Sequence, residues 1–163
     1  MMSPHIIAVT GEKNAGKTTM IEALVPALAR AGLHTAVIKH DGHRFDPDRE
    51  GTDSYRALAA GAVGAAVFDG EKFQLVKYTS VTERELAAFF PEADVILLEG
   101  LKRSSLPKIE VVRGNGAPVS DPKTWIALVT DGPMRQPGVP VFSSKDVEAL
   151  ADHLATYLKK QSG

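Results

Sequence analysis

Gly11-Glu12-Lys13-Asn14-Ala15-Gly16-Lys17-Thr18 is the stretch that decides the fold of this chain. It has the spacing of glycine, four residues, then Gly-Lys-Ser/Thr. An apolar run at 6–10 precedes it, and a helical pattern at 17–31 follows. The glycines let the backbone curl so that consecutive N–H groups point at one phosphate, and the helix N-terminus adds the positive end of its dipole. The sequence therefore predicts a phosphate-binding loop between the first strand and the first helix.

Individual residues of this loop have distinct expected roles. Lys17 would bridge the β- and γ-phosphates and is a catalytic candidate, and the Thr18 hydroxyl would contact Mg²⁺. For Lys13, a phosphate contact and an exposed solubilising side chain both remain open. The predicted nucleotide-binding residues are Gly11, Lys13, Asn14, Ala15, Gly16, Lys17, Thr18 and Thr19.

The pattern on the C-terminal side predicts the rest of the fold. Short β-branched runs alternate with longer amphipathic segments, which indicates an α/β protein with a mostly parallel sheet between two helical layers. Residues 63–69 and 72–78 flank Asp69-Gly70-Glu71, so we expect an antiparallel hairpin beside the parallel strands, giving a mixed sheet. Gly32 should end the first helix in the left-handed conformation, Thr52 should cap the next helix, and Ser143 or Ser144 should cap the last one. We expect one domain, 1–163, with a hairpin insertion near 63–78.

The composition excludes several classes of partner. The net charge of -1 over 163 residues provides no general field for nucleic acid or an anionic membrane. No cysteine is present, so disulfides and thiolate metal sites are excluded. No apolar run approaches the roughly 20 residues that span a bilayer, and no signal peptide opens the chain. We expect a cytoplasmic protein without membrane or nucleic-acid partners.

Two acidic residues are candidates for work beside the phosphates. Glu99 ends the continuously apolar strand 95–98, where it would hold Mg²⁺ together with Thr18, although a strand-terminal surface acid is the alternative. Asp53 lies near a predicted helix start. It could orient the attacking water as a catalytic residue, or act as an ordinary acid at a helix N-terminus.

A histidine-containing loop follows the second strand as Lys39-His40-Asp41-Gly42-His43. The carboxyl ends of strands are where open α/β sheets bind ligands. We therefore interpret His40 and His43, joined by Lys102, as a loop that contacts a substrate or cofactor. Solvated surface histidines are the alternative, and a structural metal is disfavoured because no fourth ligand has suitable spacing.

Taken together, the motifs resemble the molybdopterin-guanine dinucleotide biosynthesis adapter family (MobB). The resemblance covers nearly the whole chain and is carried by the phosphate loop, 39–43, Gly51-Thr52-Asp53-Ser54, 97–102 and 107–111. It implies a homodimeric GTP-binding protein with Mg²⁺ that is at most a slow GTPase. It also implies an accessory role beside the molybdenum cofactor guanylyltransferase, with molybdopterin as a candidate ligand.

The resemblance further implies where guanine would be read. Asp131 ends the run Val129-Thr130-Asp131, and it would accept hydrogen bonds from the guanine N1–H and 2-amino groups. Residues 143–145 would supply backbone contacts to the base. Two other functions remain open at this point: a small-molecule kinase whose histidine loop holds the acceptor, and a nucleotide-dependent metal-delivery protein.

Overall fold

The computed structural model describes residues 3–163. The elements, in chain order, are β1 His5–Gly11, α1 Lys17–Arg30, β2 Thr35–Lys39, α2 Asp53–Ala59, β3 Gly64–Phe68, β4 Phe73–Lys77, α3 Glu83–Ala87, β5 Val95–Glu99, β6 Lys108–Val112, η1 Pro122–Thr124, β7 Trp125–Thr130, β8 Val141–Phe142 and α4 Val147–Gln161. They fall into two compact units. One comprises the residues up to His40 together with Glu83–Gly163, and the other is Asp41–Thr82.

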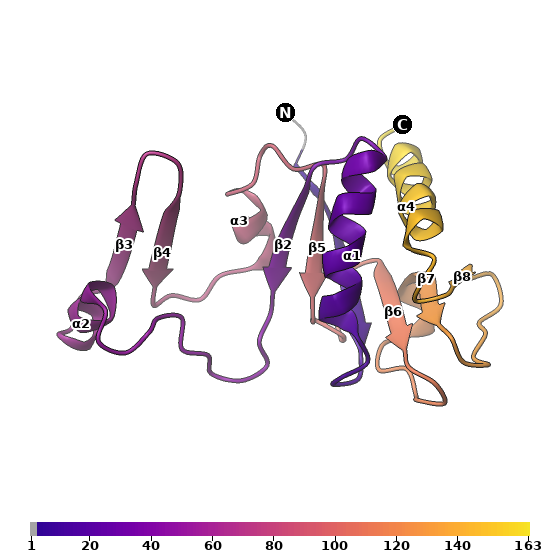
Figure 1. Cartoon of the computed structure of the whole chain (residues 1–163), viewed down its shortest axis with the longest axis horizontal. Coiled ribbons are helices and arrows are strands. Elements are labelled where there is room, and N and C mark those ends of the chain that lie inside the picture. The colour runs from indigo at the N-terminus through magenta and orange to yellow at the C-terminus, as the bar shows by residue number, and fades with distance from the viewer. Residues whose placement is uncertain (1–2) are drawn as a thin grey trace. The chain divides into compact units, whose positions relative to one another are not determined.

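The first unit is built on a six-stranded sheet in the order β2-β5-β1-β6-β7-β8 (Figure 1). Every pairing in this sheet is parallel. Parallel neighbours need long crossovers, and these crossovers place helices on the faces of the sheet. The predicted α/β class is therefore confirmed. Because β1 lies in the middle, the loop that follows it emerges between the ends of β5 and β6.

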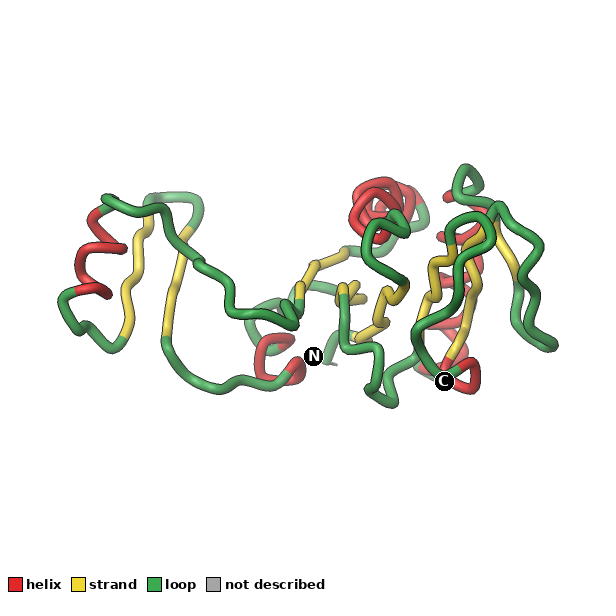
Figure 2. Tube along the Cα trace, turned by 90° about the horizontal axis from the view of Figure 1, so that it is seen from below, coloured by secondary structure: helices red, strands yellow, loops and turns green. Residues whose placement is uncertain are grey.

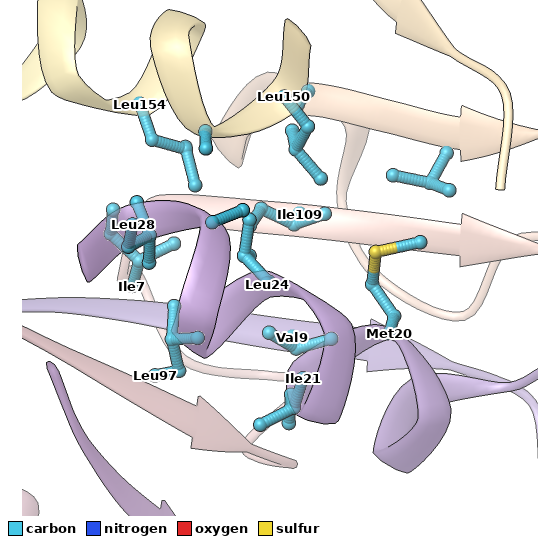
Figure 3. Close-up of a cluster of buried hydrophobic side chains, with 14 of the residues drawn as sticks. Ile7, Val9, Met20, Ile21, Leu24, Leu28, Leu97, Ile109, Leu150 and Leu154 are labelled. Carbon is cyan, nitrogen blue, oxygen red and sulfur yellow. The ribbon is translucent and has the colours of Figure 1, made fainter. Parts of the chain in front are cut away.

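Helices α1 and α4 cover one face of the sheet side by side, and Figure 3 shows the apolar cluster beneath them. Leu24 and Leu28 of α1 are four residues apart, so they lie on one helix face, and both are completely buried. Leu150 and Leu154 of α4 repeat that spacing and are buried to the same extent. Burying each such side chain contributes about 2 kcal/mol to the stability of the fold. This packing holds α1, which follows the phosphate loop, firmly against the sheet.

The opposite face carries a thinner cover. There the short helix α3 contributes Ala87 to a cluster with Ile38, Ile96 and Leu98. A third cluster, around Trp125, lies on β6 and β7. Figure 2 shows helix α1 on one side of the sheet and the short helix α3 on the other. The continuously apolar strand β5 is explained by this arrangement, since its residues 95–98 are buried on both faces.

The second unit contains α2 and the hairpin of β3 and β4. The hairpin is confirmed: its antiparallel pairing runs from Gly64↔Lys77 to Phe68↔Phe73. Asp69 forms the turn by accepting hydrogen bonds from two backbone N–H groups, at 2.8 and 2.9 Å. The expectation that the hairpin adds antiparallel strands to the main sheet is wrong, because β3 and β4 form a separate two-stranded sheet. The residues of the strands and the tight turn specify the hairpin locally. They do not indicate whether the hairpin also pairs with a strand of the main sheet.

The ends of the helices test three further expectations. Gly32, with φ of 85°, follows α1 in the left-handed conformation, as predicted. Thr52 caps α2 by accepting from the Tyr55 N–H at 3.3 Å. The cap predicted for α4 is wrong: Asp146 occupies the N-cap position, without a side-chain capping bond.

Within residues 3–163, no helix has the length and apolarity that crossing a bilayer requires.

Candidate nucleotide site

The phosphate loop occupies the predicted place between β1 and α1. Gly16 forms the helix N-cap with φ of 98°, so α1 begins directly at Lys17. The Lys17 ammonium folds back over the loop and donates to the carbonyl oxygens of Gly11 at 3.0 Å and Glu12 at 2.8 Å. These bonds hold a positive charge beside the first turn of α1, whose N–H groups have no partner within the helix. Both features favour a bound anion.

The structure brings Thr18 and Glu99 together. The Thr18 hydroxyl lies 3.1 Å and 3.3 Å from the two carboxylate oxygens of Glu99. Their elements explain the contact, since Glu99 ends β5 in register with Val9 of β1, and Thr18 lies in the first turn after the loop. A hydroxyl and a carboxylate are hard oxygen donors. Mg²⁺ binds through one or two such protein groups and completes its shell with phosphates and water, so the donor set fits that ion.

Lys13, Asn14, Ala15 and Thr19 lie in the loop or the first turn of α1 as expected, with Asn14 at a positive φ of 64°. Their contacts with a nucleotide stay predictions. Within the described part of the chain, no group of three His, Cys, Asp or Glu side chains is placed to hold a metal ion. This finding gives no support to metal delivery.

The predicted substrate loop is divided between the two units. His40 lies against the end of β5: its N–H donates to the Glu99 carbonyl at 2.9 Å. A Cβ atom on Gly100 would lie 2.9 Å from the His40 carbonyl oxygen, so glycine permits this close approach. Lys102 follows shortly after in the chain and is exposed. The structure thus brings His40 to the strand that carries Glu99.

His43 and Asp53 lie in the second unit, so their proposed roles at the phosphates stay predictions. Asp53 is the first residue of α2, next to the Thr52 cap. An acid there interacts favourably with the helix dipole, as the alternative interpretation expected. His43 donates its backbone N–H to the Asp41 side chain at 3.2 Å, which orders the start of this loop locally.

A cavity of about 470 Å³ opens beside the phosphate loop. Residues of the loop and α1, the ends of β6 and β7, and Ser144 before α4 line it, and Asp131 lies on its wall. A slightly larger cavity, of about 540 Å³, lies at the amino ends of the strands, where residues such as His5, Leu33 and Asp94 line it. Open α/β sheets bind ligands at the carboxyl ends of their strands. The smaller cavity is therefore the better candidate for a nucleotide.

Asp131 is held by three hydrogen bonds. Its Oδ1 accepts from the Ser143 hydroxyl at 2.7 Å and the Ser144 N–H at 3.1 Å, while its Oδ2 accepts from the Ser144 hydroxyl. These bonds, that of the Ser143 hydroxyl foremost, lower the pKa of Asp131 below its usual value. The group therefore stays an ionised acceptor. Whether it reads guanine stays a prediction.

Sequence reasoning gave no role to Arg113 and Glu110. Arg113 lines the cavity at the end of β6 and donates from Nη1 to the Asn14 carbonyl of the phosphate loop, at 3.5 Å. Glu110 is completely buried, and its carboxyl group accepts from the Thr10 hydroxyl, the Ser120 hydroxyl and the Val119 N–H. A charged residue within an apolar strand was the available signal for Glu110. Thr10 directly precedes Gly11, so this network holds in place the strand end from which the phosphate loop begins.

Lys108, two residues before Glu110 on the same strand face, is buried as well. Its ammonium donates to the carbonyl oxygens of Ser104 and, at 3.0 Å, Leu106. Burial lowers the pKa of Lys108, although the nearby carboxyl groups of Asp121 and Glu110 act in the opposite direction. Lys108 thereby fastens the loop that leads away from Glu99.

Comparisons with known proteins give a consistent assignment. The chain is 31% identical to the molybdopterin-guanine dinucleotide biosynthesis adapter protein of Escherichia coli, across 97% of this chain and 95% of that protein. It is likewise 31% identical to the probable adapter protein of Bacillus subtilis, across 96% and 95%. The crystal structure of Bacillus subtilis MobB superimposes with a TM-score of 0.74 at 29% identity, covering 93% of this chain and 96% of that one. The family model of molybdopterin guanine dinucleotide synthesis protein B matches residues 6–131. This chain therefore belongs to the MobB family.

Proposed function

We propose that this chain binds GTP with Mg²⁺ and serves in the cytoplasm as an adapter in molybdopterin guanine dinucleotide biosynthesis, hydrolysing GTP slowly at most. The pathway is the one named for its relatives. The observation that carries nucleotide binding is the contact between Thr18 and Glu99 at the phosphate loop. A small-molecule kinase has no comparable support from the residues described.

Each group at the loop has a task in this proposal. Mg²⁺, when bound, neutralises charge on the β- and γ-phosphates. Thr18 and Glu99 hold it, and the N–H groups at the start of α1 bind the phosphate oxygens. Lys17 exchanges its two carbonyl partners for phosphate oxygens, a stronger charge-assisted contact.

Calorimetry with GTP and ATP in the presence of Mg²⁺ tests nucleotide binding. Lys17→Ala removes two charge-assisted hydrogen bonds of about 1.5–3 kcal/mol each, so its affinity for GTP should fall at least about a hundredfold. Lys159→Ala, at an exposed position of α4, is the matched control and should bind like wild type. Unchanged affinity of Lys17→Ala would refute the phosphate-loop assignment, and tighter binding of ATP would refute the choice of GTP.

The metal assignment is tested through the dependence of GTP affinity on Mg²⁺ concentration. Glu99→Gln keeps the size of the side chain but removes its charge, and Thr18→Val removes the hydroxyl. Both variants should require more Mg²⁺ for half-maximal GTP binding and should hydrolyse GTP more slowly. Binding of GDP without Mg²⁺ should change little. An unchanged Mg²⁺ requirement in both variants would place the metal elsewhere.

The adapter role requires a partner, which we propose to be the molybdenum cofactor guanylyltransferase. The candidates for binding the pterin phosphate are His40 and Lys102 of the first unit and, separately, His43 of the second, because these side chains can donate to anionic oxygens. Co-purification of the two proteins with and without GTP tests the partner. Fluorescence titration with molybdopterin, compared between wild type and Lys102→Ala, tests the ligand. Equal affinity in both proteins would remove Lys102 from the proposal.

A homodimer is the proposed assembly. The hairpin of β3 and β4 exposes large apolar side chains, among them Phe68 at 82% and Phe73 at 67%. An isolated two-stranded hairpin is marginally stable in water, and a second copy of the same surface would cover these groups. Light scattering should give twice the mass of the chain for wild type. Phe68→Ser together with Phe73→Ser should give the monomer mass. A monomeric wild type would refute the assembly.

A further inference from the structure

The hydrogen bonds around Asp131 divide unequally between its two carboxylate oxygens. Oδ1 accepts two, from the Ser143 hydroxyl and the Ser144 N–H, whereas Oδ2 accepts one, from the Ser144 hydroxyl. A carboxylate has about four lone-pair sites, two on each oxygen. The chain therefore fills both sites of Oδ1 and one of the two on Oδ2.

The two serines also differ in what else they do. The Ser143 hydroxyl accepts from the Lys145 N–H at 3.3 Å while donating to Asp131, so its rotamer is set from both sides. Ser144 lines the cavity beside the phosphate loop. Neither serine caps α4, which begins at Val147 behind Asp146. Their hydroxyls are thus directed to an exposed aspartate rather than to the helix.

The strand register explains why these residues meet. β7 and β8 are parallel neighbours, with Val129 opposite Phe142. The residues that follow them, Asp131 on one strand and Ser143 and Ser144 on the other, consequently emerge side by side at the carboxyl edge of the sheet. The contact is fixed by the main chain of the sheet rather than by chance proximity of two mobile loops.

We propose that the two serines have opposite roles in guanine recognition. Ser143 holds Asp131 in place. The Ser144 hydroxyl occupies an acceptor site on Asp131 Oδ2 until guanine displaces it. This inference rests on the proposed binding of GTP. Guanine offers two donors on one edge, N1–H and the 2-amino group. The single free site on Oδ2 accepts one of them. The second is accommodated when the Ser144 hydroxyl rotates away into the cavity.

Inosine triphosphate is the informative probe, because hypoxanthine retains N1–H but lacks the 2-amino group. It needs one acceptor site, which is free already, so it gains nothing from the departure of the Ser144 hydroxyl. The ratio of GTP affinity to ITP affinity therefore reports on the second acceptor site. The phosphates and ribose, which are common to both nucleotides, cancel from this ratio.

The experiment measures dissociation constants for GTP, ITP and ATP by calorimetry with wild type, Ser143→Ala and Ser144→Ala. A hydrogen bond to a charged group contributes enough that Ser143→Ala should lower the GTP/ITP ratio about tenfold. Ser144→Ala removes the competitor and should raise the ratio about threefold to tenfold. Affinity for ATP should remain unchanged in both variants. Ser143→Thr, which restores a hydroxyl, should recover the wild-type ratio.

Two controls separate this positioning role from a structural one. Ser162→Ala alters a serine hydroxyl that lines the cavity at the amino ends of the strands, and it should leave every affinity unchanged. Thermal unfolding of each variant reports any loss of stability. If Ser143→Ala and Ser144→Ala both weaken all three nucleotides in proportion, the serines merely support the loop, and the proposal is overturned.

The remaining outcomes distinguish this inference from the proposed function on which it rests. A wild-type protein that prefers GTP, with Ser143→Ala and Ser144→Ala leaving the GTP/ITP ratio unchanged, overturns this inference and leaves GTP binding intact. A wild-type protein and variants that bind GTP, ITP and ATP equally overturn guanine recognition itself.

Discussion

Replacing Glu110 with alanine tests how strongly the core of the sheet supports the phosphate loop. Glu110 lies on β6 opposite Thr10, the residue before Gly11. It is completely buried and accepts from two hydroxyls, those of Thr10 and Ser120, and from the Val119 N–H at 2.6 Å. The substitution removes the acceptor of all three donors at once and leaves a cavity.

The expected loss in the free energy of unfolding depends on which donors find new hydrogen-bond partners. The Thr10 and Ser120 hydroxyls lie 3.1 Å apart and can bond to each other, so one of them recovers an acceptor. The Val119 N–H and one hydroxyl proton lose theirs, at about 1–3 kcal/mol for each buried group. Adding part of the transfer free energy of the lost methylenes, we expect the free energy of unfolding to fall by about 4 kcal/mol.

Chemical denaturation monitored by the fluorescence of the single tryptophan, Trp125, provides the assay, because its indole N–H donates to Ser120 at 2.8 Å within this network. Glu110→Gln keeps an acceptor and should lose about 1 kcal/mol. The exposed Glu92→Ala is the matched control and should change stability by less than about 0.5 kcal/mol. A loss below about 1 kcal/mol for Glu110→Ala would show that water satisfies these donors and would refute a supporting role for Glu110.

Three further predictions concern the site. Gly11→Ala would place a Cβ atom 2.4 Å from a backbone carbonyl of β6, so calorimetry should show loss of GTP binding, whereas Gly42→Ala, with open space around it, should bind normally. Arg113→Ala removes the cation that donates to the Asn14 carbonyl and should weaken GTP binding about fivefold with little change in the unfolding midpoint; equal affinity would contradict this role. Asp131 has a lowered pKa when folded, so it contributes stability that is full above about pH 4 and lost as the pH falls through the folded pKa. The stability difference between wild type and Asp131→Asn should therefore narrow in acid, and a constant difference would refute the linkage.

The parts of the fold that the sequence predicts best are those specified by local chemistry. The phosphate loop, Gly32 after α1, Thr52 before α2 and the buried strand ending at Glu99 all depend on residues within a few positions of one another. Turn glycines, capping hydroxyls and apolar runs act over such distances. The structure also brings Thr18 and Glu99 together, because parallel topology brings strand ends to one edge, while their binding of Mg²⁺ stays a prediction.

The incorrect predictions concern residues whose interaction partner lies far away in the sequence. Ser143 and Ser144 have the composition of a helix cap, and a cap was the local prediction. Their hydroxyls bind Asp131 instead, twelve and thirteen residues away in sequence. That competition is decided by the pairing of β7 with β8, which no short window of sequence contains. The hairpin of β3 and β4 was likewise correct as a local unit and wrong in its expected attachment.

Glu99 and Glu110 show why an acid on a buried strand cannot be given a role from its position alone. Both lie on strands that flank β1, opposite Val9 and Thr10 respectively. Side chains alternate between faces along a strand. Glu99 ends its strand, is only half-buried and reaches Thr18 of α1, so it can hold a cation. Glu110 has Val111 and Val112 after it and faces the other side, where the loop carrying Val119 and Ser120 closes over it. Glu99 is thus a candidate metal ligand and Glu110 a buried support of the same loop. The two differ by one residue in register against β1 and by the two residues that follow Glu110 in its strand.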